Sequence, residues 1–167
     1  MIFSYKKIFY IFLLSFSLGI LRNLLLEEPL SLIKEKRQIK TIKLIEDSSI
    51  QFELPENMTE PHNVTIKVVE HLRRKDIATI IDARDEEDFK NGHIKDAINI
   101  PYDYYEDFEF LLDEVDLERI IIIYCSGGEC SLSLDLADYL MQERGFFNVL
   151  IYEGGWPEWK ESGYEIE

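Results

Sequence analysis

The spacing of the hydrophobic positions changes twice along the chain and divides it into three parts. Residues 8–21 are almost all apolar, and after Arg22-Asn23 the apolar run resumes up to residue 26. Residues 27–61 mix isoleucine and leucine with charged residues and contain proline breaks. From residue 62 onward, short β-branched runs alternate with segments of helical periodicity. The pattern predicts an N-terminal membrane anchor or signal segment (1–26), a connector (27–61) and a folded domain (62–167).

The folded domain is expected to be of the α/β class. Apolar runs predict strands at residues 78–82, 97–100, 120–124 and 149–152. Amphipathic or capped segments predict helices at residues 65–75, 85–92, 104–116, 132–145 and 156–160. In the helix at 104–116, Phe108, Leu111 and Leu112 are expected to face inward. Strands separated by helices predict a largely parallel sheet covered on both faces.

The N-terminal segment begins with Lys6-Lys7 and continues into its apolar run. Residues 8–26 approach the length of about 20 residues that a membrane span needs, because Arg22 can extend its charged end to the interface. A cleavable signal peptide and an uncleaved anchor both fit this order. The anchor is favoured, since cleavage after Gly19 would leave a strongly apolar mature end. A buried core helix is disfavoured because the segment has no polar face.

The distribution of basic residues predicts the side of the membrane. Lys6-Lys7 ahead of the apolar run is typical of a segment whose N-terminus stays in the cytoplasm, which places the domain outside. Four basic residues between positions 34 and 40 favour the opposite orientation. The signal-like order decides the prediction, which is a single N-terminal span with an extracytoplasmic domain.

Charge is distributed unevenly along the chain. The formal net charge is −15; residues 1–43 hold eight Lys/Arg against three Glu and carry +5, so the remainder carries −20. An acidic body excludes nucleic acid as an expected partner, because phosphate binding needs clustered basic residues. The acidity is interpreted as promoting solubility. No metal site or cofactor is expected, since there are two thiols and His62, His71 and His93 stand at no zinc-finger spacing.

Candidate chemistry gathers in the loop that follows the strand at 120–124. This loop consists of Cys125, Ser126, Gly127, Gly128, Glu129, Cys130 and Ser131. In open α/β sheets, ligands bind at the C-terminal edge of the strands, and loop N–H groups and a helix N-terminus there favour a thiolate. Cys125 is therefore the candidate nucleophile, and the alternative is an inert buried cysteine. Both cysteines lie in this loop, so they are either a reactive pair or one reactive thiol with a small neighbour.

Several ordered motifs resemble those of rhodanese domains over about residues 62–167. They are Asp82-Ala83-Arg84, Phe89, Gly92-His93-Ile94, residues 97–101, Tyr124-Cys125 and Gly154-Gly155-Trp156 with Trp159 and Gly163. The resemblance implies a three-layer sandwich around about five parallel strands, and a cysteine, Cys125, that carries sulfane sulfur as a persulfide. It also implies ion pairs or backbone bonds beside the sheet for Asp82 and Arg84. His93 is interpreted as a structural histidine, and both tryptophans as core residues, with Trp156 also a candidate for lining the site.

The chain departs from the motifs of the family at two places. Asp96 stands where the motif has glycine, which is expected to affect only a turn. The loop lacks the arginine or lysine that many thiosulfate-using members carry, and Glu129 beside Cys125 would raise the pKa of the thiol and repel anionic thiosulfate. Variants with a Cys-x4-Cys loop leading into a serine-bearing helix, here Cys125, Cys130 and Ser133, are the most similar.

The leading functional hypothesis is a sulfurtransferase that takes sulfane sulfur from a donor and passes it to a thiol or other nucleophile. Cys130 then attacks the Cys125 persulfide, closes a reversible disulfide, or is only a small residue at the helix start. Two further hypotheses are a thiol–disulfide oxidoreductase that uses both cysteines, and a non-catalytic docking module with a rhodanese fold. A phosphatase is excluded because the sixth position after Cys125 is Ser131 rather than arginine.

Overall fold

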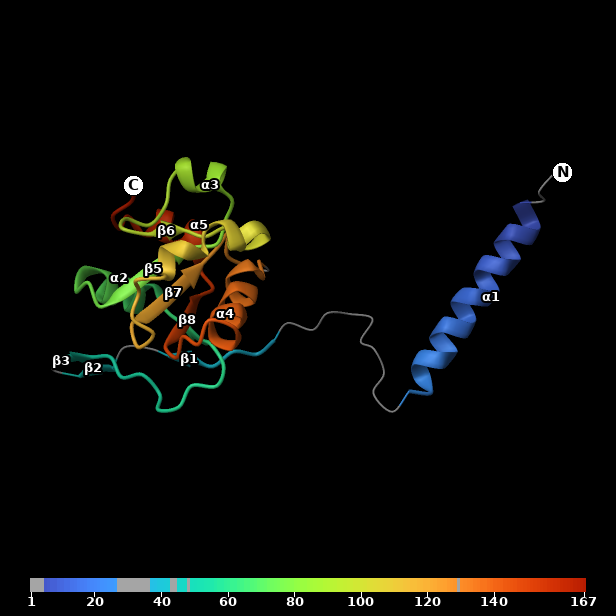
Figure 1. The fold of residues 1–167 in the computed structure, drawn as a ribbon, viewed down its shortest axis with the longest axis horizontal. Helices are drawn as coiled ribbons and strands as arrows, with labels where there is room; N and C mark the ends of the chain where they lie inside the picture. The colour runs from blue at the N-terminus through green and yellow to red at the C-terminus, as the bar shows by residue number, and fades with distance from the viewer. Residues whose placement is uncertain (1–4, 27–36, 43–44, 48, 129) are drawn as a thin grey trace. The chain divides into compact units, whose positions relative to one another are not determined.

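The computed structural model describes residues 5–26, 37–42, 45–47, 49–128 and 130–167 (Figure 1). The chain divides into two units, residues 1–38 and 39–167. Two of the four basic residues between positions 34 and 40, and the first ten residues of the expected connector, lie outside the described residues. Glu129 of the candidate loop also lies outside them.

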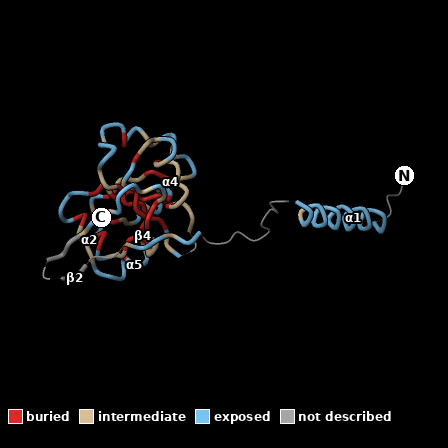
Figure 2. Tube along the Cα trace, turned by 90° about the horizontal axis from the view of Figure 1, so that it is seen from below, coloured by how far each residue is buried: buried red, intermediate tan, exposed pale blue. Residues whose placement is uncertain are grey.

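The N-terminal unit contains one helix, α1 (Tyr5–Leu24), among its described residues. None of its side chains is buried, and Figure 2 shows the helix exposed along almost all of its length. Its 20 residues are long and apolar enough to cross a membrane, a property that signal sequences share. The N-terminal hydrophobic helix that the sequence predicts is thereby confirmed.

The C-terminal unit is built on a parallel sheet of six strands in the order β1-β4-β8-β7-β5-β6. These strands are β1 (Thr41–Ile42), β4 (His62–Val64), β5 (Ala78–Asp82), β6 (Ile98–Asn99), β7 (Ile120–Tyr124) and β8 (Val149–Tyr152). β2 (Ile45–Asp47) and β3 (Ser49–Gln51) form a separate antiparallel pair. The parallel α/β fold is confirmed, and the sheet gains an edge strand, β1, from residues assigned above to the connector.

Helices and 3-10 turns connect the strands. They are α2 (Ile66–Arg74), α3 (Glu86–Lys90), η1 (Tyr102–Asp107), η2 (Glu109–Leu112), α4 (Leu132–Gln142) and α5 (Gly155–Ser162). The prediction of a helix at 104–116 is wrong: this stretch holds two 3-10 segments, and the backbone leaves helical geometry at Tyr104. Acidic side chains at helical spacing in this stretch repel one another, which disfavours a continuous α-helix. Leu112 is buried as expected, whereas Leu111 is 38% exposed.

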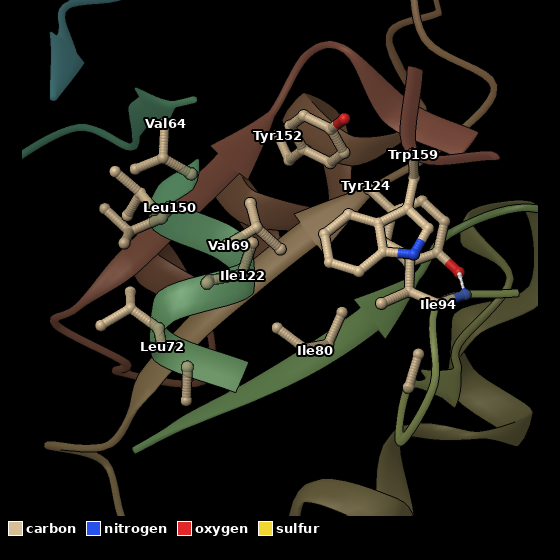
Figure 3. Packing of buried hydrophobic residues seen from close by; sticks show 13 residues of the cluster. Val64, Val69, Leu72, Ile80, Ile94, Ile122, Tyr124, Leu150, Tyr152 and Trp159 are labelled. Atoms are coloured by element: carbon tan, nitrogen blue, oxygen red, sulfur yellow. Dashed lines mark hydrogen bonds between the residues drawn. The ribbon is translucent and has the colours of Figure 1, made fainter. Parts of the chain in front are cut away.

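Two hydrophobic layers cover the two faces of the sheet, and alternate residues of β7 contribute to each. Ile122 and Tyr124 face the layer that contains α2 and Trp159 of α5 (Figure 3). Ile121, Ile123 and the following Cys125 face the layer that contains α4. This alternation follows from the two-residue period of a strand. It sets the Cys125 side chain against the N-terminal half of α4.

The C-terminal end of the chain is tied to the domain by Arg73. Its nearly buried guanidinium pairs with Glu70, Asp96 and Glu165 at 3.0, 3.1 and 2.7 Å. Asp96 has a φ of 66°, a left-handed conformation that aspartate adopts more readily than most residues. The aspartate in place of glycine therefore still forms the turn, and it adds an ion pair.

Glu165→Gln is expected to lower the melting temperature at pH 7 and to matter less as the solution is acidified. Hydrogen bonds from Arg73 and then Lys95 hold the pKa of Glu165 below its usual value of 4.5. A lowered pKa contributes stability above that value, and the contribution is lost as the pH falls through the folded-state pKa. Thermal unfolding from pH 7 down to about pH 3 measures the convergence of variant and wild type. Exposed Glu161, changed to Gln, is the control, and a pH-independent difference would contradict the prediction.

Candidate functional site

Cys125 lies directly after β7, at the C-terminal edge of the sheet, and is 2% exposed. Its Sγ is 3.5 Å from Oγ of Ser133 and 3.7 Å from the carbonyl oxygen of Cys130. Cys125 and Cys130 are joined as a disulfide, with their Cα atoms 6.6 Å apart. The structure therefore brings the two predicted sulfur residues and Ser133 into one cluster, in its oxidised form.

The loop backbone packs directly against the turn between β8 and α5. Gly127 and Gly155 both have left-handed φ, of 74° and 60°. A Cβ on Gly127 would lie 2.5 Å from the Gly154 carbonyl oxygen, and one on Gly155 would lie 2.5 Å from the Cys125 carbonyl oxygen. Contacts this short leave room only for glycine at both positions. Trp156 N–H, in the same turn, donates to the Cys125 carbonyl at 2.9 Å, which fixes the strand end.

The sequence predicts that the loop N–H groups favour a thiolate at Cys125. In this oxidised form, the N–H of Cys130 donates to the Gly127 carbonyl at 3.2 Å, so it is already satisfied. Ser131 begins α4 as its N-cap residue and makes no side-chain capping bond. Ser126 and Gly128 are exposed at the surface of the loop. The part of the loop open to a ligand is thus the Ser126–Gly128 stretch.

A small pocket of about 90 Å³ lies beside Ser126. Asp85, Asp88 and Asp103 contribute to its lining, together with Arg84. The guanidinium of Arg84 is taken up by Asp82, so the ionised groups of the pocket are mainly carboxylates. These acidic pocket residues are not among the site residues predicted from the sequence. They lie in or next to the segments that follow β5 and β6, and the rule that such segments meet at one edge of a parallel sheet was the available signal.

Asp82 and Arg84 form a buried ion pair below this pocket. The guanidinium of Arg84 donates to both carboxylate oxygens of Asp82, at 2.6 Å for the shortest bond, and to the Gly92 carbonyl at 2.8 Å. Burial opposes the charge of Arg84, but the hydrogen bonds and charge of Asp82 prevail and raise the pKa of the guanidinium. The Arg84 guanidinium carbon also lies 5.1 Å from the ring centre of Trp156.

Trp156 connects the ion pair to the loop. The Trp156 ring contacts Arg84, and a Cβ on Gly92 would lie 3.0 Å from that ring. The backbone N–H of Trp156 donates to the Cys125 carbonyl. This arrangement gives Asp82 and Arg84 a route to the cysteine loop through packing rather than through direct contact. Burial also raises the pKa of Tyr124, whose hydroxyl accepts the Ile94 N–H at 3.1 Å (Figure 3).

His93 belongs to the structure around α3. Its ring stacks on Phe89 with centres 3.7 Å apart, and Nδ1 lies 2.9 Å from the Phe89 carbonyl oxygen. Nε2 is 3.7 Å from a carboxylate oxygen of Glu167. These contacts explain the histidine without a role in chemistry. Among the described residues, no group of three or more His, Cys, Asp or Glu is arranged to hold a metal ion.

Comparison with known proteins places residues 65–162 in a family model described as the rhodanese-like domain. Thiosulfate sulfurtransferase GlpE of Actinobacillus pleuropneumoniae serotype 5b is 37% identical over 90 residues, which cover 54% of this chain and 78% of that protein. The rhodanese-like domain of Alr3790 from Anabaena superposes with a TM-score of 0.51 and 26% identity, covering 66% of this chain and 80% of that one. A tRNA uridine(34) hydroxylase of Buchnera aphidicola is 31% identical over 61% of this chain and 34% of its own length.

Proposed function

This chain belongs to the rhodanese-like domain family, and on that premise we propose that Cys125 carries sulfane sulfur as a persulfide. The Cys125 thiolate attacks the terminal sulfur of a donor, a new S–S bond forms, and the remainder of the donor leaves with the electron pair. An acceptor thiolate then attacks the outer sulfur of the persulfide, and Cys125 departs as thiolate. Donor and acceptor exchange one sulfur atom, so the cycle needs no external oxidant or reductant.

The observation that carries the proposal is the setting of Cys125. Its sulfur lies at the C-terminal edge of the sheet, near the N-terminus of α4 and 3.5 Å from the hydroxyl of Ser133. A helix N-terminus and a hydroxyl donor both stabilise a thiolate or a persulfide anion. This is the environment that a sulfur nucleophile requires.

We propose a donor that carries less negative charge at its sulfur end than thiosulfate does. The described loop residues include no lysine or arginine, and the neighbouring pocket is lined by Asp85, Asp88 and Asp103. Carboxylates that line the pocket beside the loop repel an incoming dianion and disfavour its approach. A low-molecular-weight persulfide or a protein persulfide, neutral or singly charged at its sulfur end, fits this edge better.

Thiol–disulfide exchange is a second candidate function, and the Cys125–Cys130 disulfide is the observation that favours it. The same two sulfurs would then cycle between dithiol and disulfide, with oxidation of one external dithiol for each disulfide reduced. In the sulfur-carrier function, a sulfur atom passes from the donor to Cys125 and then to the acceptor. In thiol–disulfide exchange, no sulfur atom is transferred and only electrons are exchanged.

We further propose that the protein is attached to a membrane. In this proposal, residues 1–26 form a single membrane anchor, with a signal segment as the alternative, and residues 62–167 form the sulfur-carrying domain, which lies outside the cytoplasm. Residues 27–61 form the connector, of which Thr41–Ile42 adds edge strand β1 to the sheet of the domain. An oxidising compartment of that kind is also where a disulfide such as Cys125–Cys130 persists. The proposed orientation would be contradicted if the domain is protected from protease in intact cells and loses this protection only when the cytoplasmic membrane is lysed.

Mass spectrometry of the full-length protein in detergent tests the sulfur-carrier function. The protein is first reduced, freed of reductant, and incubated in turn with thiosulfate, cysteamine persulfide and glutathione persulfide. We expect a gain of about 32 Da, one sulfur atom, located on Cys125. The gain should be larger with either persulfide than with thiosulfate. Absence of an adduct with every donor would overturn the proposal, and reversible formation of only the disulfide would favour the second candidate.

A further inference from the structure

The two sulfurs of the disulfide differ in their access to solvent. Cys125 is 2% exposed and packs in the hydrophobic layer that contains Leu136 and Ala137 of α4. Cys130 is only partly buried. Thiol–disulfide exchange requires the attacking thiolate to reach one sulfur atom, and access is one of the factors that decide which sulfur it is. The solvent-facing member of the pair is Cys130.

The two sulfurs also differ as leaving groups. Ser133 is 3% exposed, stands in the first turn of α4, and places its hydroxyl 3.5 Å from Cys125 Sγ. A hydroxyl that donates to sulfur forms a stronger bond once the sulfur becomes an anion. The N-terminal end of this 11-residue helix acts in the same direction. Cleavage of the S–S bond is therefore favoured when the electron pair moves to Cys125.

We propose that the disulfide is opened at Cys130 and that Ser133 is a positioning residue that stabilises Cys125 as the departing thiolate. An external thiolate attacks Cys130 Sγ; the new bond joins the external sulfur to Cys130, and the bond to Cys125 breaks. A second external thiolate then attacks the mixed disulfide, giving an external disulfide and the Cys130 thiolate. The external dithiol or pair of monothiols is oxidised, and the protein disulfide is reduced.

This inference rests on the proposed function, because it describes how Cys125 is made available to accept sulfur. In the disulfide, Cys125 has no free thiol, so it cannot take sulfur from a donor. Opening at Cys130 delivers Cys125 directly as the thiolate, in the position where it reacts. The redox state of Cys130, which is partly exposed, thereby controls whether the buried Cys125 is available to accept sulfur.

The first experiment locates the sulfur that is attacked. Oxidised full-length protein in detergent is mixed with excess 2-mercaptoethanol, a neutral monothiol, and quenched in acid after short intervals. Fragment-ion mass spectrometry then places the adduct on one cysteine. Re-closure by the other cysteine returns the starting disulfide, whereas its attack on the external sulfur would move the adduct, so the adduct at the shortest quench time reports the site of attack. We expect adducts on Cys130 over Cys125 by about ten to one; adducts on Cys125, or an equal division, would overturn the proposal.

The second experiment tests Ser133 in a Cys130→Ser background, where Cys125 is the only thiol. The rate of alkylation by iodoacetamide is followed against pH to find the midpoint of thiolate formation. Ser133→Ala is expected to raise the midpoint by about one pH unit, whereas Ser133→Thr, which keeps the hydroxyl, stays near the parent value. An unchanged midpoint in a folded Ser133→Ala protein would remove Ser133 from the proposal.

Persulfide loading of the same Cys130→Ser protein separates failure of this inference from failure of the proposed function. If Cys125 takes up sulfur but opening occurs at Cys125, only the regulatory inference fails. If opening occurs at Cys130 but Cys125 never takes up sulfur from any donor, the sulfur-carrier function fails and the exchange chemistry stands.

Discussion

Replacement of Cys125 by alanine is expected to lower the rate of sulfur transfer to the uncatalysed background, a loss of at least about three orders of magnitude. The reason is that the proposed cycle stores the sulfur atom on this one side chain between its two steps. Neither the Ser133 hydroxyl nor the N-terminal end of α4 can hold a sulfur atom once the thiol is gone. Release of sulfide from a persulfide donor in the presence of dithiothreitol measures the rate.

Cys130→Ala gives the matched comparison, since it removes the other sulfur of the same loop. This variant cannot form the disulfide, so Cys125 is expected to accept sulfur without prior reduction. Wild-type protein in its oxidised form should accept sulfur only after reduction, which is measured as the gain of about 32 Da in the absence of dithiothreitol. Transfer that survives in the Cys125→Ala variant would show that the chemistry lies elsewhere, and transfer that disappears only in the Cys130→Ala variant would favour Cys130 as the carrier.

Asp82→Ala is expected to lower the free energy of unfolding by about 3–5 kcal/mol. It leaves the guanidinium of Arg84 buried, with a side chain 4% exposed, and without the carboxylate that accepts its hydrogen bonds. The remaining bond to the Gly92 carbonyl does not compensate a buried charge. Urea unfolding of the full-length protein in detergent, followed by tryptophan fluorescence, measures the loss. Fluorescence should also report the altered setting of Trp156, which the guanidinium contacts.

Glu86→Gln is the control for Asp82→Ala, because it removes a carboxylate from a salt bridge at the surface. Glu86 pairs with Lys90 at 2.8 Å, and the two side chains are 45% and 70% exposed. Solvent screens such pairs, so the expected loss of stability is much smaller than that for Asp82→Ala. If Asp82→Ala costs no more than Glu86→Gln, then the buried pair is not what supports the loop, and its connection to Cys125 through Trp156 is incorrect.

The parts of the fold that follow from local sequence were predictable. The run of isoleucines at 120–123 has the β-branched character of a buried strand, and the two-residue period then fixes which layer Cys125 faces. Thr65 and Asp85 stand at the N-cap positions of α2 and α3, where such residues are favoured. The position of Cys125 at the sheet edge follows from the strand and the glycine loop that succeeds it.

Features that depend on distant parts of the chain were not predictable from pattern alone. Edge strand β1 is only two residues long and gains its pairing from β4, so its local sequence carries no clear signal. The prediction of a helix at 104–116 rests on the apolar spacing of Phe108, Leu111 and Leu112, which matches a helix. The prediction is wrong because the backbone at Tyr104 leaves helical geometry. The close approach of Gly127 to Gly154 joins segments that are far apart in sequence.

That close approach has a consequence for the order in which the protein is made. Cys125 and Cys130 leave the ribosome before the turn at Gly154–Trp156 that completes their surroundings. At about 5–20 residues per second, the growing chain carries both thiols for seconds without this support. Because only five positions separate the two cysteines, a disulfide between them closes at low entropic cost before the sheet is complete. Early pairing would thus protect the reactive sulfur of a nascent chain, and reduction would make it available after folding.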